Sequence, residues 1–443
     1  MKKQDVIQYK ESIIEQLSTL CSYKSVYTPD EEGTPFGVEN KKCLEKALEI
    51  AGSYGFKTVN VDDYCGYVEM GQGEEIIGIL AHLDVVPVSD SWNTDPFTLT
   101  LIDDKYYARG TSDDKGAVVA SLAAMRALKP LEHTFTKRVR LILGCNEESG
   151  SRCIKYYVKK YGHVDYGFTP DGDFPLVFGE KGMVGGLLKL KSDKILDIKG
   201  GTVRNTVCAA VEITLKENSF NLEKLDKFFK ENDIIYSLNG NTLIVNGIAA
   251  HASIPQQGVN AISYALEGLY YADINDKAVD SYHHLVGLGY NGEGLKIDFE
   301  DEYGKLTFNV GVCYKEDDYL CFTIDIRFPV TLKKELIINT IKENDKGLIY
   351  GLDGIDPLFY SPDLPMIKAL HKAYVDVTND TVNQPKVIGG GTYAKSMNNI
   401  VAFGCDDLKH NYHIHDDNEF VSWDSLETQV ACYYHAILNL MEI

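Results

Sequence analysis

One short apolar segment limits what this chain can fold into. Residues 76–81 read IIGILA, which is long enough for a strand and too short for an ordinary helix. An apolar run without polar alternation indicates a strand buried on both faces, as in a parallel sheet covered by helices. His82 and Asp84 follow at once. Ligands of open α/β sheets gather outside the carboxyl ends of the strands, so this strand end is a candidate site.

We interpret His82 as a metal ligand and Asp84 as the carboxylate that orients it. A capped strand end with a hydrogen-bonded structural histidine explains this stretch equally well when it is taken alone. The rest of the chain has to decide between the two interpretations.

Strand-like and helix-like segments alternate before residue 183. We expect strands at 57–61, 67–70, 76–81, 98–102, 139–143 and 164–169, and helices at 6–21, 38–54, 117–128 and 149–160. This alternation predicts an α/β catalytic domain with a mixed, mostly parallel sheet and helices on both faces.

From residue 183 the strands become longer and alternate apolar with polar residues. We expect strands at 186–190, 209–215, 241–245, 305–314 and 319–327, and helices at 222–232, 259–270 and 332–344. This pattern predicts an inserted α+β domain over 183–353, and the resemblance described below implies that it is a lid domain. The catalytic domain then consists of 1–182 and 354–443, with its last helices at 365–377 and 423–441.

Composition excludes several partners. The net charge is −21, from 44 basic and 65 acidic residues, which argues against binding to a nucleic-acid backbone. No apolar run reaches the ~18 residues of a membrane span, and no apolar segment follows the first lysines as in a signal peptide. The ten cysteines include no C-x-x-C pair, so we expect reduced thiols in a cytoplasmic protein.

Candidate metal ligands recur at the predicted strand ends and loops. They are His82, Asp113, Glu147, Glu148, Asp171 and the histidine-rich loop 410–415. Two imidazoles, a carboxylate able to bridge and two terminal carboxylates suit two cations ~3.5–4 Å apart. Mixed nitrogen and oxygen ligands favour Zn²⁺, and Mn²⁺ or Co²⁺ could also bind.

The adjacent Glu147 and Glu148 suggest a division of roles. Only one of two neighbouring carboxylates can comfortably ligate the same ion, which leaves the other free to carry a proton. A cation lowers the pKa of its bound water to about 7, so such a carboxylate could act as a general base. A solvated acidic turn is the simpler explanation of the pair when it is taken alone.

Five motifs then occur in the order found in a known family. They are HLD from His82, RGTSDDKG from Arg109, NEESG from Asn146, TPD from Thr169 and HDDNE from His415. Together they resemble the M20 metallopeptidases, and most of all bacterial dipeptidases of the PepV type. The motifs span nearly the whole chain, from 82 to 419.

The resemblance implies a role for each ligand. His82, Asp113 and Asp171 would hold one divalent metal ion, and Asp113, Glu148 and His415 the other, with Asp113 as the bridge. Glu147 would be the general base, and Asp84 would support His82. The resemblance also implies a cis peptide bond between Asp113 and Asp114.

One of the five ligands, the residue at position 171, differs between activities within the family. Dipeptidases and aminopeptidases tend to carry Asp there, whereas deacylases and carboxypeptidases tend to carry Glu. Asp171 therefore favours a small peptide with a free amino terminus as substrate. The alternatives are an M20 deacylase or carboxypeptidase acting on N-acyl amino acids, similar to a desuccinylase, and a non-catalytic binding protein on the same fold.

The inserted domain carries further residues that resemble the PepV group. His251 resembles the lid histidine that steadies the oxyanion, although a lone histidine is more often structural. Asn205 resembles the asparagine that assists it, and Arg327 the arginine that binds the substrate carboxylate. The loop with Gly390, Gly391 and Thr392 resembles one whose backbone N–H groups bind that carboxylate, and a flexible turn is its alternative.

Two stretches depart from the family pattern or leave it open. His410 and His413 could compete with His415 as ligand, and we choose His415 because Asn-Glu follows it at the family spacing. Residues 404–408 differ from the expected sequence, which could alter the substrate pocket. The large insertion replaces a partner subunit in the PepV type, so the resemblance implies a monomer.

Overall fold

The structure is a computed structural model that describes residues 1–30, 33–217, 220–407 and 409–443. The chain forms two units. Unit 1 consists of Met1–Phe178, Tyr360–Lys386 and Gly391–Ile443, and unit 2 consists of Gly179–Phe359 and Val387–Gly390. Unit 2 therefore consists of two segments of the chain, and the second is the short segment Val387–Gly390.

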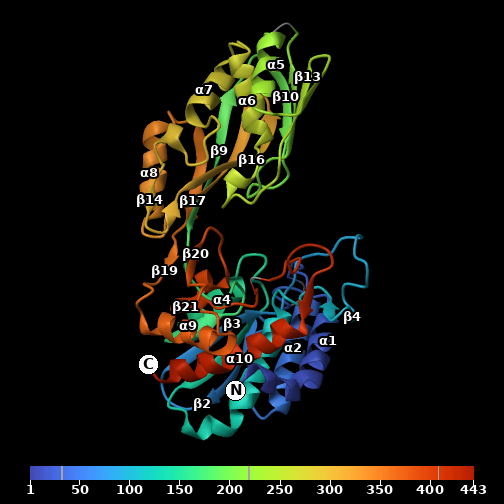
Figure 1. The fold of residues 1–443 in the computed structure, drawn as a ribbon, viewed down its shortest axis with the longest axis vertical. Helices are drawn as coiled ribbons and strands as arrows, with labels where there is room; N and C mark the ends of the chain where they lie inside the picture. The colour runs from blue at the N-terminus through green and yellow to red at the C-terminus, as the bar shows by residue number, and fades with distance from the viewer. Residues whose placement is uncertain (31–32, 218–219, 408) are drawn as a thin grey trace. The chain divides into compact units, whose positions relative to one another are not determined.

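The apolar segment after Glu75 forms β3 (Ile76–His82), which lies inside a nine-stranded sheet (Figure 1). The strand order of this sheet is β1 (Lys57–Val61), β2 (Cys65–Gly71), β6 (Arg138–Gly144), β3, β7 (Tyr166–Thr169), β21 (Ile400–Ala402), β8 (Val177–Glu180) and β19 (Leu358–Phe359). The ninth strand, β20 (Lys386–Ile388), pairs with β8. The central strands β6, β3, β7 and β21 are parallel, and the flanking strands are antiparallel.

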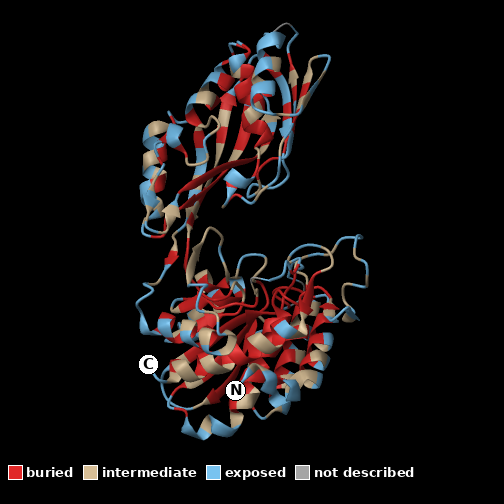
Figure 2. Ribbon diagram, in the orientation of Figure 1, coloured by how far each residue is buried: buried red, intermediate tan, exposed pale blue. Residues whose placement is uncertain are grey.

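Helices cover both faces of this sheet, as successive residues of β2 show. Gly66 faces Leu44 and Leu48 of α2 (Val38–Ser53), whereas the ring of Tyr67 meets Tyr157 of α4 (Arg152–Tyr161) on the opposite face. Strands fully covered in this way have to be apolar on both sides, which is the pattern that residues 76–81 show. Figure 2 shows the buried strands between the helices of unit 1.

The helices of unit 1 are α1 (Lys10–Cys21), α2 (Val38–Ser53), α3 (Lys115–Leu128), α4 (Arg152–Tyr161), α9 (Pro365–Thr378) and α10 (Trp423–Met441), with 3-10 turns at Lys3–Tyr9, Lys129–Thr134 and Tyr393–Ser396. A small sheet joins β4 (Thr100–Ile102), β5 (Lys105–Tyr107) and β22 (Phe420–Ser422). This sheet brings the start of the RGTSDD motif next to the end of the HDDNE motif.

Unit 2 contains an eight-stranded sheet whose neighbouring strands are all antiparallel. Its strand order is β12 (Tyr236–Asn239), β13 (Thr242–Asn246), β11 (Ala210–Leu215), β10 (Ile195–Gly200), β16 (Thr307–Glu316), β17 (Tyr319–Phe328), β9 (Gly182–Lys191) and β18 (Ile349–Ile355). Its helices are α5 (Leu222–Glu231), α6 (Ala261–Tyr271), α7 (Lys277–Leu285) and α8 (Lys334–Asn344).

Short elements complete unit 2, namely β14 (Glu300–Asp301), β15 (Gly304–Lys305) and 3-10 turns at Pro255–Gln257 and Glu293–Leu295. Alternate residues of the long strands, such as Val211, Ile213 and Leu215, join the helices in one apolar core. The predicted fold class, a mixed α/β domain with an α+β insertion, is thereby confirmed. None of the described helices is long and apolar enough to cross a membrane.

Candidate metal centre

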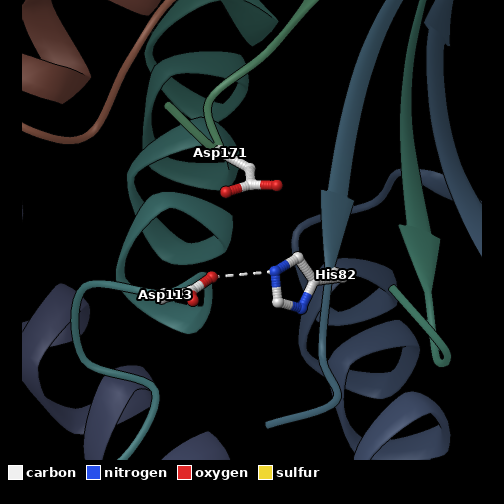
Figure 3. A group of neighbouring side chains, drawn as sticks. All are labelled: His82, Asp113 and Asp171. Carbon is white, nitrogen blue, oxygen red and sulfur yellow. Dashed lines mark hydrogen bonds and ion pairs between the residues drawn. The ribbon is translucent and has the colours of Figure 1, made fainter. Parts of the chain in front are cut away.

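The end of β3 places His82 at the centre of a buried group of ligands. His82 Nε2 lies 2.9 Å from Asp113 Oδ1, and the His82 side chain is fully buried. Asp171, from the loop after β7, completes the group, and one ligand atom of each residue lies within 4.8 Å of the others. Figure 3 shows the three side chains pointing towards one another. Three donors from three separate segments of the chain therefore face one small volume.

Asp113 also faces a second group through its other oxygen. His415 Nε2 lies 2.8 Å from Asp113 Oδ2 and 3.2 Å from Glu148 Oε2. Asp113, Glu148 and His415 form the second group whose ligand atoms lie within 4.8 Å of one another. Because each Asp113 oxygen faces one imidazole, this carboxylate has the arrangement that a bridging ligand requires.

A buried carboxylate that the sequence analysis used only for spacing holds Asp113 in place. Glu419 accepts hydrogen bonds from the backbone N–H groups of Gly110, Ser112 and Asp113, and it pairs with Arg109 at 2.8 Å. Four donors on one carboxylate fix the shape of the loop.

The peptide bond between Asp113 and Asp114 is cis, as expected. The Asp114 side chain belongs to neither ligand group and accepts a hydrogen bond from the backbone N–H of His82 at 3.0 Å. Residues on both sides of this bond therefore take part in the site, one through its carboxylate and the other by fixing β3.

Asp84 contacts the site in a way that the sequence did not reveal. His82 Nδ1 bonds the backbone oxygen of Asp84 at 3.0 Å, and the Asp84 carboxylate is 3.6 Å away. That carboxylate instead accepts the backbone N–H groups of Glu147 at 3.0 Å and Glu148 at 3.1 Å. One residue therefore orients both the imidazole and the loop that carries the two glutamates.

The cluster's own groups shift one another's pKa. Burial would lower the pKa of His82, but bonding to Asp113 and Asp84 raises it well above its usual value. Hydrogen bonds to Asp113 and then Glu148 raise the pKa of His415 to about 11. Burial would raise the pKa of Asp113, yet the two imidazoles hold it below its usual range. Since a metal ligand must be deprotonated, cations would displace protons from these imidazoles.

Glu147 belongs to neither ligand group but lies beside both. Burial and then repulsion by Asp171 raise its pKa to about 8. Burial and then Asp113 also raise the pKa of Asp171, to about 7. A carboxyl group whose pKa lies near neutral pH can both accept and donate a proton.

The loop 410–415 brings one imidazole to the cluster. Within the described residues, His410 contacts Asp407 and Tyr412, and His413 lies against the ring of Phe420. Of the three histidines in this loop, His415 alone belongs to a ligand group of the described chain. His415 is therefore the imidazole of this loop that lies at the cluster, and its role as a metal ligand stays a prediction.

The described part of the atypical stretch, residues 404–407, lies against the Asp171 loop. The backbone N–H groups of Cys405 and Asp406 donate to Gly172 O at 2.9 and 3.1 Å. Burial and then Asp173 raise the pKa of Asp406 to about 8. Leu408 lies outside the described residues.

Unit 2 brings together the residues predicted for its own site. Thr206 pairs with His251 in an isolated β-bridge, and the Ala252 N–H donates to Asn205 O at 2.9 Å. Burial and then the nearby Arg327 lower the pKa of His251. Arg327 Nη1 lies 3.5 Å from Gly389 O, next to Gly390. His251, Asn205 and Arg327 thus gather in one region of this unit.

The rest of the glycine loop belongs to unit 1. Thr392 accepts the backbone N–H of Ala394 and begins the turn Tyr393–Ser396. The Tyr393 N–H donates to Asp171 Oδ2 at 3.2 Å, and its ring stands edge-on to His82. Gly391 and Thr392 therefore lead directly into a residue that positions two of the candidate ligands.

The donor set fits a pair of divalent cations. Each group offers one imidazole and two carboxylates, with Asp113 shared. Among the described residues, buried Glu148 Oε1 has no hydrogen-bond partner, an arrangement that is costly unless a cation or donor satisfies it. Mixed nitrogen and oxygen donors of this kind suit Zn²⁺ and its neighbours.

Solved structures with the same fold include two dipeptidases. Human carnosine dipeptidase 1 matches with a TM-score of 0.61 and 15% identity, over 100% of this chain and 98% of its own. The di-peptidase Dug1p from Saccharomyces cerevisiae matches with a TM-score of 0.58 and 14% identity, over 100% of this chain and 98% of its own. At this identity the likeness establishes the fold.

The sequence comparison shows the family. The model of peptidase family M20/M25/M40 matches residues 78–439. "Putative dipeptidase YtjP" of Bacillus subtilis (strain 168) is 33% identical over 98% of this chain and 98% of its own length. "Putative dipeptidase SH1171" of Staphylococcus haemolyticus is 31% identical over 99% of both. The chain belongs to peptidase family M20/M25/M40.

Proposed function

We propose that this chain is a dipeptidase that uses two divalent cations to hydrolyse the peptide bond of dipeptides with a free amino terminus. The single observation that carries the proposal is Asp113, whose two oxygens each face an imidazole beside Glu148 and Asp171. The names of the similar bacterial proteins support the substrate class. Asp at position 171 supports the same choice, since family deacylases tend to carry Glu there.

His82, Asp113 and Asp171 would hold one cation, and Asp113, Glu148 and His415 the other. When bound, such a pair supplies Lewis acidity to a carbonyl and lowers the pKa of water to about 7. Zn²⁺ is the ion that we propose, with Mn²⁺ or Co²⁺ as substitutes. Asp84 and Glu419 keep the loops that carry these ligands in place.

Glu147 would move the proton. It accepts the proton of the attacking water as the new C–O bond forms, and it donates that proton to the leaving nitrogen as the C–N bond breaks. Its raised pKa, set by burial and by Asp171, fits a group that works in both directions. The substrate amine that is released then leaves uncharged or takes a further proton from solvent.

A comparison of substrates tests this proposal. The purified protein should cleave dipeptides, lose that activity in a chelator and regain it with Zn²⁺, Mn²⁺ or Co²⁺. Cleavage of N-acyl amino acids in preference to free dipeptides would identify a deacylase or carboxypeptidase. Tight cation binding with no cleavage of either class would identify a binding protein.

We also propose that the protein is a monomer, as the resemblance to the PepV type implies. A measurement of its size in solution tests this.

We also propose that His251 stabilises the oxyanion. His251→Ala should lower kcat by about 10²–10³-fold and change KM much less, because the contact strengthens in the transition state. Steady-state kinetics on a dipeptide measures both constants. His251 Nδ1 forms a hydrogen bond with Ser253 Oγ at 2.7 Å. Ser253→Ala is therefore a matched control, because it removes the partner of the imidazole and leaves the imidazole itself in place. An effect on KM alone would assign His251 to substrate binding instead.

A further inference from the structure

The helices of unit 2 pack against one face of its sheet, and buried polar side chains lie on the other face. On β17, Ile324 and Ile326 belong to the apolar core that includes the helices. The alternate residues of this strand point to the opposite face, where Tyr319 is 42% exposed and Asp325 only 3%. Asn309 of β16 lies opposite Asp325 and is also buried. Another part of the chain therefore covers this end of the face.

Two neighbouring segments reach this end of the sheet. The first, 204–206, precedes β11 and carries Asn205, and the second, 250–252, follows β13 and carries His251. Thr206 pairs with His251 in an isolated β-bridge, which joins the two segments. The two residues for which we expect a role at the oxyanion therefore belong to one pair of segments.

One buried amide holds the first segment. Asn309 Nδ2 donates to Arg204 O and to Thr206 O at 3.1 Å each, which are the carbonyl groups on either side of Asn205. Asn309 Oδ1 accepts a hydrogen bond from Asn260 Nδ2 at 3.4 Å. The nitrogen of this amide thus faces two acceptors and its oxygen faces a donor, so only one orientation of the side chain satisfies all three partners.

Asn260 connects this amide to a helix. Its Oδ1 caps α6 by accepting the backbone N–H groups of Ile262 at 3.1 Å and Ser263 at 3.3 Å. Its Nδ2 also donates to Val310 O at 2.8 Å. Because Asn260 is buried and bonded on both sides, the side chain of Asn309 is held by a helix end as well as by its own strand.

Thr307 holds the second segment. It lies two residues before Asn309 on β16, so its side chain is on the same face of the sheet. Thr307 is buried, and its Oγ1 donates to Ala252 O at 3.1 Å. Ala252 follows His251 directly in the chain. Each of the two segments is therefore fixed to the sheet by one buried side chain.

We propose that Asn309, together with Thr307, is a positioning residue that keeps His251 and Asn205 aligned for the transition state. Removing the donor of a buried hydrogen bond leaves its carbonyl unsatisfied, so the segments should shift when Asn309 is replaced. A group that stabilises an oxyanion contributes fully only while its geometry is held fixed. This inference rests on the proposed function, which gives His251 its role.

Asn309→Leu in the full-length protein tests the inference, because leucine is close to asparagine in shape and forms no hydrogen bonds. It should lower kcat for a dipeptide about 10- to 100-fold, a part of the contribution of one oxyanion donor, and change KM much less. In a protein that already carries His251→Ala, it should lower kcat less than about 3-fold further, since the residue that it positions is gone. Thr307→Val keeps the shape and loses a single bond, so it should show a smaller effect of the same kind, and it decides the question if Asn309→Leu does not fold.

Tyr282→Phe is the matched control, because it removes a buried hydrogen bond elsewhere in unit 2. Tyr282 Oη lies 2.8 Å from Ser263 Oγ, and the side chain is fully buried. This variant should keep the kcat and KM of the unaltered protein. A loss of kcat in Asn309→Leu no larger than that in Tyr282→Phe would overturn the inference. An undiminished further loss in the His251→Ala protein would overturn it as well.

Amide hydrogen exchange separates this inference from the proposed function. The backbone N–H groups of Val207 and Ala252 donate from one segment to the other at 2.8 and 2.9 Å, so their exchange reports whether the segments stay together. Both should exchange about 10-fold faster in Asn309→Leu than in Tyr282→Phe. If the unaltered protein cleaves no dipeptide, the proposed function fails and this measurement decides whether Asn309 holds the segments. Equal exchange in the two variants overturns the inference.

Discussion

Glu147→Gln is expected to keep both cations and to lower kcat for a dipeptide by about 10²–10⁴-fold, the contribution of a positioned general acid or base. Glu147 lies outside both ligand groups, so its replacement removes proton transfer and leaves the donor set intact. The amide is close to the carboxylate in shape and cannot carry the proton. Steady-state kinetics together with metal analysis of the same preparation measures both effects.

Glu148→Gln is the matched control, because it makes the same chemical change one residue along the chain. Glu148 Oε2 lies 3.2 Å from His415 Nε2 in the second ligand group, so this variant should lose cation affinity as well as rate. Excess Zn²⁺ should restore part of the activity of Glu148→Gln and none of that of Glu147→Gln. Unchanged turnover in Glu147→Gln would remove it from the mechanism.

The fold could be predicted where one physical rule dominates a segment. Residues 76–81 had to be a strand covered on both faces, and β3 (Ile76–His82) differs by one residue. The amphipathic pattern at 423–441 predicted α10 (Trp423–Met441) without error. In both segments the period of the apolar residues agrees with the tertiary packing, so the sequence alone was sufficient.

The helix α7 (Lys277–Leu285) was missed for a reason that is equally physical. It is short, with nine residues, and no element was expected over 277–285. The structure shows that Asp276 caps it by accepting the N–H groups of Ala278 and Val279. His283 is partly buried, stacks on Tyr270 and bonds Glu267. The cap residue was a readable signal, whereas the stacking partners depend on tertiary structure.

The candidate site could be predicted only in part, because its residues are distant in the sequence. Local spacing suggested His82, and the order of the motifs added the remaining ligands. The part played by Glu419 could not be inferred, since it depends on a loop more than 300 positions away reaching its carboxylate. Asp84 shows the same limit, because its bonds to the backbone of Glu147 and Glu148 exist only in the folded chain.

Asp113→Ala should have the largest effect of any single substitution in unit 1. This residue is the only member of both ligand groups among the described residues, so its loss should weaken both cation sites together. We expect fewer than one cation per chain after dialysis, compared with two in the unaltered protein, and a fall in kcat/KM at least as large as that of Glu147→Gln. Metal analysis and kinetics on a dipeptide provide the test.

Asp173→Asn is the control that separates ligation from the loss of any nearby acidic charge. Asp173 lies two residues after Asp171 and pairs with Lys386 at 2.6 Å, outside both ligand groups. It should keep two cations and most of the activity. Loss of a single cation in Asp113→Ala would mean that one site is held by its other residues alone, and Asp113 would then be a terminal ligand. Retention of two cations would contradict the bridging role, because the arrangement of each Asp113 oxygen opposite one imidazole would then have no part in holding the metal pair.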